Sequence, residues 1–228
     1  MRKCSIFLSI LLTLLWSVSG HTAVQWQVLS PVTFTRGTGK PVTEIFTFMA
    51  LGGTATLKLT NGTLADTTGE KVSSSLIKLN DTLLCSPSEF NQTVTSIEKQ
   101  ITLMDGSNRL EVTLMGKPGG QVTLEVLAET AEITPEISIV QTANALRAGD
   151  IDLVLKGFEQ RELTTSAIQS LDTEKRYQLA LWIENAELIK ETDSRRVYRY
   201  TWPDGFGEKY SDFTMVRNEE GKWIISNW

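Results

Sequence analysis

The sequence predicts two domains, an all-β sandwich followed by an α+β domain in which helices precede an antiparallel sheet. Alternating apolar positions with turn residues between them fill residues 21–128, as in consecutive antiparallel strands. The composition changes over residues 129–135, which we interpret as a linker. In residues 136–228 the apolar period is first helical and then, from Glu187, again that of strands.

The N-terminus has the features of an export signal. Met1-Arg2-Lys3 is followed by an apolar run over residues 5–16 and by small residues up to Gly20. The run is shorter than the roughly 20 residues that a membrane-spanning helix needs. We therefore expect residues 1–20 to be a signal peptide cleaved after Gly20, with cleavage after Ala23 as the alternative. The mature protein would be secreted, periplasmic or at the cell surface, and would meet the membrane only through this segment.

Charge and residue usage exclude several functions. The chain has 22 basic and 27 acidic residues, so we expect no binding to nucleic acid. The only histidine, His21, lies beside the cleavage site, which leaves the usual catalytic triads and zinc sites without an imidazole. Cleavage also removes Cys4, and Cys85, in a strand segment, is expected to be a small buried apolar residue. We expect no cofactor, no metal site and no enzymatic activity.

In the first domain the apolar runs predict strands, which are residues 24–34, 44–50, 54–60, 76–80, 94–103, 110–114 and 122–126. Pro31 indicates an edge strand or a bulge in the first of them. Gly52-Gly53 predicts a hairpin connection, and turns are expected at Asn80-Asp81 and at Asp105-Gly106. A shift of apolar spacing near Glu98 predicts a β-bulge there.

Part of this domain resembles a known family. The segments Ile77-Lys-Leu-Asn80, Phe90 and Leu103-Met-Asp-Gly-Ser-Asn-Arg-Leu-Glu-Val112 resemble galactose-binding-like jelly-roll domains and repeats of large bacterial surface proteins. Asp81 stands where that pattern has glycine. The resemblance implies a jelly-roll sandwich in a bacterial protein and does not establish sugar binding. An immunoglobulin-like sandwich is the alternative.

The second domain is expected to hold four helices and four strands. One helix has Ile139, Val140, Ala143 and Leu146 on one face and ends at Gly149. Asp150 and Asp172 are expected to cap later helices. The last of these, at about residues 173–185, is expected to have Leu179, Trp182, Ile183 and Ala186 on one face. The expected strands are residues 187–192, 195–202, 209–217 and 222–227.

The C-terminal motif Gly221-Lys-Trp223-Ile-Ile225, after a strand with Phe213, resembles nuclear-transport-factor-like and cystatin-like domains. The resemblance covers about residues 136–228. It implies a sheet that curls into a cup able to hold a ligand.

Candidate ligand-binding residues gather on two of these strands. Tyr198, Tyr200 and Trp202 share one strand face, which either lines such a cup or is the core surface that covers the helices. Asp212 on the neighbouring strand is the only carboxylate expected to reach a cup. Phe206 follows in a hairpin turn, which would expose two large aromatic side chains, those of Trp202 and Phe206. We therefore expect a non-catalytic exported module of the bacterial envelope or surface that binds carbohydrate or protein. The alternative is a small-ligand-binding or enzymatic cup in the second domain.

Overall fold

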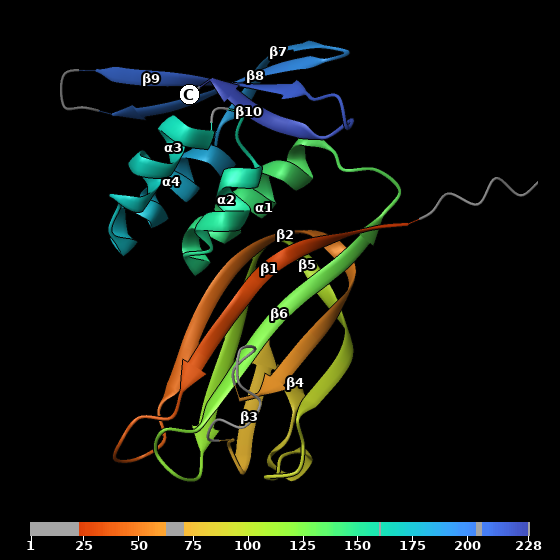
Figure 1. Cartoon of the computed structure of the whole chain (residues 1–228), viewed down its shortest axis with the longest axis vertical. Helices are drawn as coiled ribbons and strands as arrows, with labels where there is room; N and C mark the ends of the chain where they lie inside the picture. Colours follow the sequence, from red (N-terminus) through yellow and green to blue (C-terminus); the bar gives the residue numbers. More distant parts are fainter. Residues whose placement is uncertain (1–22, 63–70, 160, 204–206, 228) are drawn as a thin grey trace, which may run out of the picture.

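The structure is a computed structural model that describes residues 23–62, 71–159, 161–203 and 207–227. The expected signal peptide, residues 1–20, lies outside the described residues and stays a prediction. Figure 1 shows three layers: a large β-sheet body, a layer of helices, and a smaller sheet on the far side of the helices. Within the described ranges, no helix has the length and apolar character needed to span a membrane.

The larger sheet is antiparallel, with strand order β1-β6-β2-β5-β3-β4. Its elements are β1 (Val24–Thr35), β2 (Thr43–Asn61), β3 (Ser74–Leu79), β4 (Thr82–Cys85), β5 (Ser96–Met115), β6 (Gln121–Thr130) and a short 3₁₀ turn (Pro87–Glu89). The long strands β2 and β5 pair along their whole length. The second half of β2 also pairs with β6, whereas the second half of β5 pairs with β3. The sheet thus bends into two facing halves that enclose one core, which is a sandwich made from a single sheet.

The hairpin expected at Gly52-Gly53 is wrong, because these residues lie inside the continuous strand β2. Both have positive φ, +71° and +96°, a conformation that glycine adopts without steric cost. Before the pair, the buried residues of β2 include Phe48 and Ala50, which have even numbers. After it, they include Ala55 and Leu57, which have odd numbers. The two glycines therefore form a corner at which the sheet bends and the buried side of the strand changes.

The turn expected at Asp105-Gly106 is wrong for the same reason, because β5 runs through it opposite Leu51 and Ala50. The bulge expected near Glu98 is also misplaced, since the ladder is regular there. Buried positions on β5 change register between Leu103 and Asn108 instead. The change of apolar spacing in this part of the sequence therefore came from the bend of β5 and not from a bulge at Glu98.

Other local predictions in this sheet are confirmed. β1 is an edge strand, and its pairing with β6 shifts register on either side of Leu29, as Pro31 indicated. Asn80 and Asp81 both have positive φ, at 50° and 65°, between β3 and β4. The short polar side chains of these two residues allow that turn without glycine.

The helices cover one face of the smaller sheet, whose strand order is β10-β9-β8-β7. The elements are α1 (Pro135–Ala148), α2 (Ile151–Lys156), α3 (Arg161–Gln169), α4 (Thr173–Glu184), β7 (Glu187–Thr192), β8 (Arg195–Pro203), β9 (Glu208–Arg217) and β10 (Trp223–Asn227). The expected caps are confirmed. Gly149 ends α1 at φ 74°, and the carboxylates of Asp150 and Asp172 accept hydrogen bonds from the backbone of α2 and α4 at 3.0 and 2.8 Å.

Helix α1 belongs to two cores. Ile137 and Val140 pack into the core of the larger sheet, whereas Ala143 and Leu146 pack into the core between the helices and the smaller sheet. The connection between β6 and α1 is only residues 131–134. The division into two domains at residues 129–135, and the nuclear-transport-factor-like assignment of the second, both stay predictions.

A buried asparagine fixes α1 to the larger sheet. Asn144, 1% exposed, donates through Nδ2 to the carbonyl oxygens of Val28 and Met49, both at 2.7 Å. Its Oδ1 accepts the Met49 N–H at 3.0 Å. β6 pairs with β2 only from residue 55 onward, so at Met49 the amide makes the two hydrogen bonds that a neighbouring strand residue would make. One turn later, Arg147 pairs with Glu184 of α4 at 2.5 Å, and both side chains are buried.

Candidate ligand-binding surface

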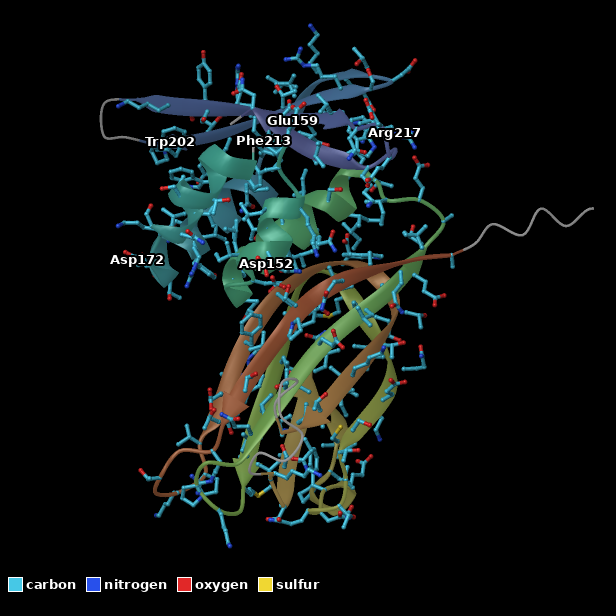
Figure 2. The ribbon with its side chains drawn as sticks, viewed as in Figure 1. Asp152, Glu159, Asp172, Trp202, Phe213 and Arg217 are labelled. Carbon is cyan, nitrogen blue, oxygen red and sulfur yellow. The ribbon has the colours of Figure 1, made fainter. Side chains whose placement is uncertain are left out.

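The three aromatic residues predicted on β8 do lie on one face of the strand, and that face is turned toward the helices. Figure 2 shows Trp202, and Phe213 of the adjacent strand β9, on the helix side of the smaller sheet. Tyr198 is only 5% exposed, and its ring stacks on Phe213 at a centroid distance of 5.2 Å. Burial, followed by the negative charge of Glu136, raises the pKa of Tyr198. The structure thus places Tyr198 in the core.

Tyr200 and Trp202 meet a third ring, Trp182 of α4, and we call these three residues the aromatic cluster. The ring centroid of Trp182 lies 5.7 Å from those of both Tyr200 and Trp202, which are 5.8 Å from each other. Despite these contacts Trp182 is 41% exposed. Two indoles and a phenol at the protein surface form a patch of the kind that marks ligand contact.

The sequence did not identify Trp182 as part of this surface. Its spacing placed it on one helix face with Leu179 and Ile183, but those two are buried whereas Trp182 is 41% exposed. Trp182 lies at the margin of the apolar face of α4. A tryptophan at such a margin is the sequence feature that could have indicated an exposed aromatic residue. Its partners are 18 and 20 residues away in sequence, and only the packing of β8 against α4 brings them together.

A small cavity of about 90 Å³ lies beside the cluster. Its lining is mainly apolar and includes Trp182 and Tyr200 with Phe158, Leu179 and Ile225. Small-molecule sites have volumes of about 300–1,000 Å³. This cavity is therefore of a size for one apolar group, such as a side chain of a partner.

Asp212 borders the small cavity beside the aromatic cluster, but its carboxylate is hydrogen-bonded to Arg199. It pairs with Arg199 across β9 and β8, and Arg199 occupies the strand face opposite to that of Tyr198 and Tyr200. The carboxylate accepts two hydrogen bonds from the Arg199 guanidinium, at 2.7 and 2.8 Å. These bonds hold the pKa of Asp212 below its usual value, and Arg199 also lies 3.9 Å from the ring centre of Tyr210. A carboxylate so engaged has little basicity, which disfavours a role as general base.

Phe206 lies outside the described residues, and its part in the surface stays a prediction. Cys85 is fully buried, and burial, with a smaller contribution from Glu89, raises the pKa of its thiol to about 11. The expectation that Cys85 is a buried apolar residue is confirmed. Among the residues that the structure describes, no group of three or more metal-ligating side chains is gathered in one place.

No family model and no curated protein matches the chain. Solved structures that resemble part of it include the pre-peptidase C-terminal domain of a collagenase from Bacillus anthracis, at 14% identity over 43% of this chain and 88% of that one, with a TM-score of 0.30. A family 35 carbohydrate-binding module from Clostridium thermocellum is 13% identical over 46% of this chain and 97% of that one, with a TM-score of 0.27. The chain spans 29% of an exo-β-1,3-galactanase from Phanerochaete chrysosporium, at 16% identity and a TM-score of 0.24. Scores of this size do not establish a common fold, so the proposals below depend on the residues of this chain.

Proposed function

We propose that the protein is an exported, non-catalytic binding module of a bacterial envelope or surface, and that its ligand contacts the aromatic cluster. The observation that carries the proposal is the exposure of Trp182 in contact with Tyr200 and Trp202. Phe206, four residues after Trp202, is included in the proposed surface. Tyr198 packs in the core beneath this surface, and Asp212 borders the cavity beside it.

Carbohydrate is the ligand class that we favour. The C–H groups of a sugar ring carry partial positive charge and pack against the negative face of an aromatic ring, while its hydroxyl groups stay in water. An exposed indole that contacts two further rings offers such a face. Because packing already holds its rotamer, ligand binding costs little side-chain conformational entropy.

A glycan array and affinity electrophoresis with soluble polysaccharides test the proposal. We expect reproducible retention by the mature protein and at least a tenfold loss with Trp182→Ala, since removal of an aromatic binding residue costs about 2 kcal/mol or more. Tyr210→Ala is the matched control, because Tyr210 is 61% exposed on the opposite face. If no glycan is retained, or if Trp182→Ala is retained like the wild type, the carbohydrate proposal fails.

The second candidate is a protein ligand, and the cavity of about 90 Å³ beside the cluster favours it. A partner could insert one apolar side chain there, as anchor residues do at protein interfaces. A pull-down from envelope extracts, followed by identification of the partner, tests this candidate. If the partner protein is lost with Trp182→Ala and added glycans do not compete with it, the ligand is a protein and not a carbohydrate.

A further inference from the structure

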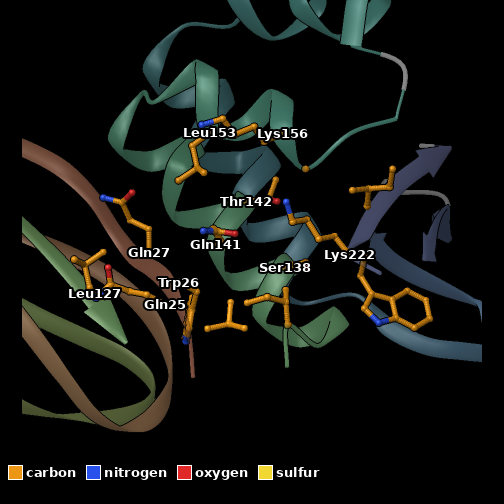
Figure 3. A pocket seen from close by; sticks show the side chains of 15 residues that line it. Gln25, Trp26, Gln27, Leu127, Ser138, Gln141, Thr142, Leu153, Lys156 and Lys222 are labelled. Carbon is orange, nitrogen blue, oxygen red and sulfur yellow. The ribbon is translucent and has the colours of Figure 1, made fainter. Parts of the chain in front are cut away.

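A second and larger cavity lies where three parts of the molecule meet. It has a volume of about 380 Å³ and is bordered by β1 of the larger sheet, by α1 and α2, and by β10 of the smaller sheet (Figure 3). This volume is within the range of small-molecule sites, which often lie between separately packed units. The aromatic cluster contributes no residue to it.

The charge of the lining is one-sided. Lys156 is the last residue of α2, and Lys222 directly precedes β10. Among the described residues that line the cavity there is no carboxylate. The one described acidic partner is Glu220, whose carboxylate lies 2.8 Å from Lys222 Nζ in a pair that is mostly exposed and therefore weak. In a chain of net charge −5, a cavity bordered by two ammonium groups attracts an anion.

The rest of the lining suits a polar ligand with hydroxyl groups. Gln25, Ser138, Gln141 and Thr142 bring amide and hydroxyl groups to it. Figure 3 shows Lys222 extending toward Thr142 of α1, and Gln27 on the opposite side of the cavity. Amides and hydroxyls both donate and accept hydrogen bonds, so they can contact ligand hydroxyls in either sense.

Hydrogen bonds between the elements that border the cavity hold its walls in place. Asn144 fixes α1 to β1 and β2. The backbone after α2 is bonded to β10, where Ile225 N–H donates to the Gly157 carbonyl at 2.7 Å and Glu159 N–H donates to the Ile225 carbonyl at 2.9 Å. A Cβ on Gly157 would lie 2.6 Å from Thr142 Oγ1, so α2 is packed closely on α1. A cavity with walls fixed in this way needs little ordering before it binds a ligand.

We propose that this cavity binds a small polyhydroxylated anion, with the anionic group between Lys156 and Lys222 and the hydroxyl groups on the amides and hydroxyls of β1 and α1. The site is separate from the aromatic cluster, so the protein would have two ligand sites. The anion can be a carboxylate or a phosphate, because ammonium groups recognise both as point charges.

Isothermal titration calorimetry of the mature protein tests the proposal, with gluconate, glucose 6-phosphate and glucose as probes. We expect at least one of the two anions to bind with a Kd of about 1 mM or below, and neutral glucose to bind at least tenfold more weakly. Added salt should weaken the binding of the anion because the ammonium groups are exposed to solvent. The comparison between gluconate and glucose 6-phosphate shows which anionic group is preferred.

Lys156→Gln and Lys222→Gln keep most of the side-chain length and remove the charge. Each should lower the affinity about tenfold, which is the loss expected for one charge-assisted hydrogen bond. Lys117→Gln is the matched control, because Lys117 is exposed in the turn between β5 and β6. Binding of glucose equal to that of the anions, no anion binding, or no effect of either lysine variant would each overturn the proposal. Trp182→Ala should not change anion binding, and the lysine variants should not change glycan retention, so failure here is distinguishable from failure of the proposed function.

Discussion

The two sheets bury their apolar faces in different ways. The larger sheet bends at Gly52-Gly53 and packs one half against the other, so that its strands supply most of its core. The smaller sheet stays open and buries one face under helices. Tyr210 on its opposite face and the edge strand β7 are exposed. The comparison teaches that the larger sheet depends on a backbone feature within its strands, whereas the smaller sheet depends on side chains from other elements. Helix α1 joins the two, because it contributes to both cores.

Asn144→Leu removes the polar link between the two regions and should have the largest effect. Leucine is close in size but leaves the carbonyl groups of Val28 and Met49 and the Met49 N–H without their partner. We expect a loss of about 3 kcal/mol in the free energy of unfolding, measured by urea denaturation. Gln178→Leu on the exposed face of α4 is the control and should change stability by about 0.5 kcal/mol or less. Equal effects of the two substitutions would contradict the role of Asn144.

Gly52→Ala tests the corner of the larger sheet. An L-residue at φ +71° costs about 1–2 kcal/mol, and the new Cβ would lie 3.3 Å from the backbone nitrogen of Asp105. We expect a destabilisation of that size in the same denaturation experiment. Gly37→Ala is the control, because a Cβ there would have no atom within 4 Å. A Gly52→Ala protein as stable as the wild type would mean that the bend does not depend on glycine.

Glu89→Gln should have the smallest effect and should depend on pH. The hydrogen bond from Lys99, and then that from the Ser86 N–H, lower the pKa of Glu89 in the folded protein. A lowered folded-state pKa stabilises the protein above the unfolded pKa of about 4.3, and this stabilisation is lost as the pH falls through the folded pKa. Because the side chains of Glu89 and Lys99 are both 34% exposed, we expect Glu89→Gln to lower the free energy of unfolding by only about 0.5 kcal/mol at pH 7.

Thermal unfolding of the wild type and of Glu89→Gln, at neutral pH and at about pH 2.5, measures this difference. The two proteins should converge at the lower pH. Glu98→Gln changes an exposed carboxylate on β5, next to Lys99, and should match the wild type at both. A Glu89→Gln difference that persists unchanged in acid would show that it does not come from the ionised carboxylate.

The strands of the smaller sheet could be predicted closely from the sequence, because polar turns separate their alternating apolar positions. The bounds of β7 to β10 differ by one residue or less from the expected ones. Helix α3 (Arg161–Gln169) was predicted less closely, since it was expected at about residues 165–171. The larger sheet was predicted less well. Gly52-Gly53 and Asp105-Gly106 are compatible with a hairpin turn and with a corner, and only the pairing of β2 with β5 decides between them.

The candidate surface was predictable only along one strand. The alternation of Tyr200 and Trp202 placed both on one face, but nothing local indicated that Trp182 would join them or that Asp212 would be hydrogen-bonded to Arg199. Asn144 was missed for a related reason. A single asparagine on a helix face is read as solvated, and its backbone partners lie 95 and 116 residues away.

The contact between Asn144 and Met49 also bears on how molecules of this protein avoid one another. Before residue 55, β2 has no β6 beside it, and an open strand edge is a template for pairing with a strand from another molecule. Helix α1 occupies that edge with a side chain, which cannot be extended into a further strand. A version of the protein without residues 135–148 would leave the backbone of Met49 open and should self-associate through this edge.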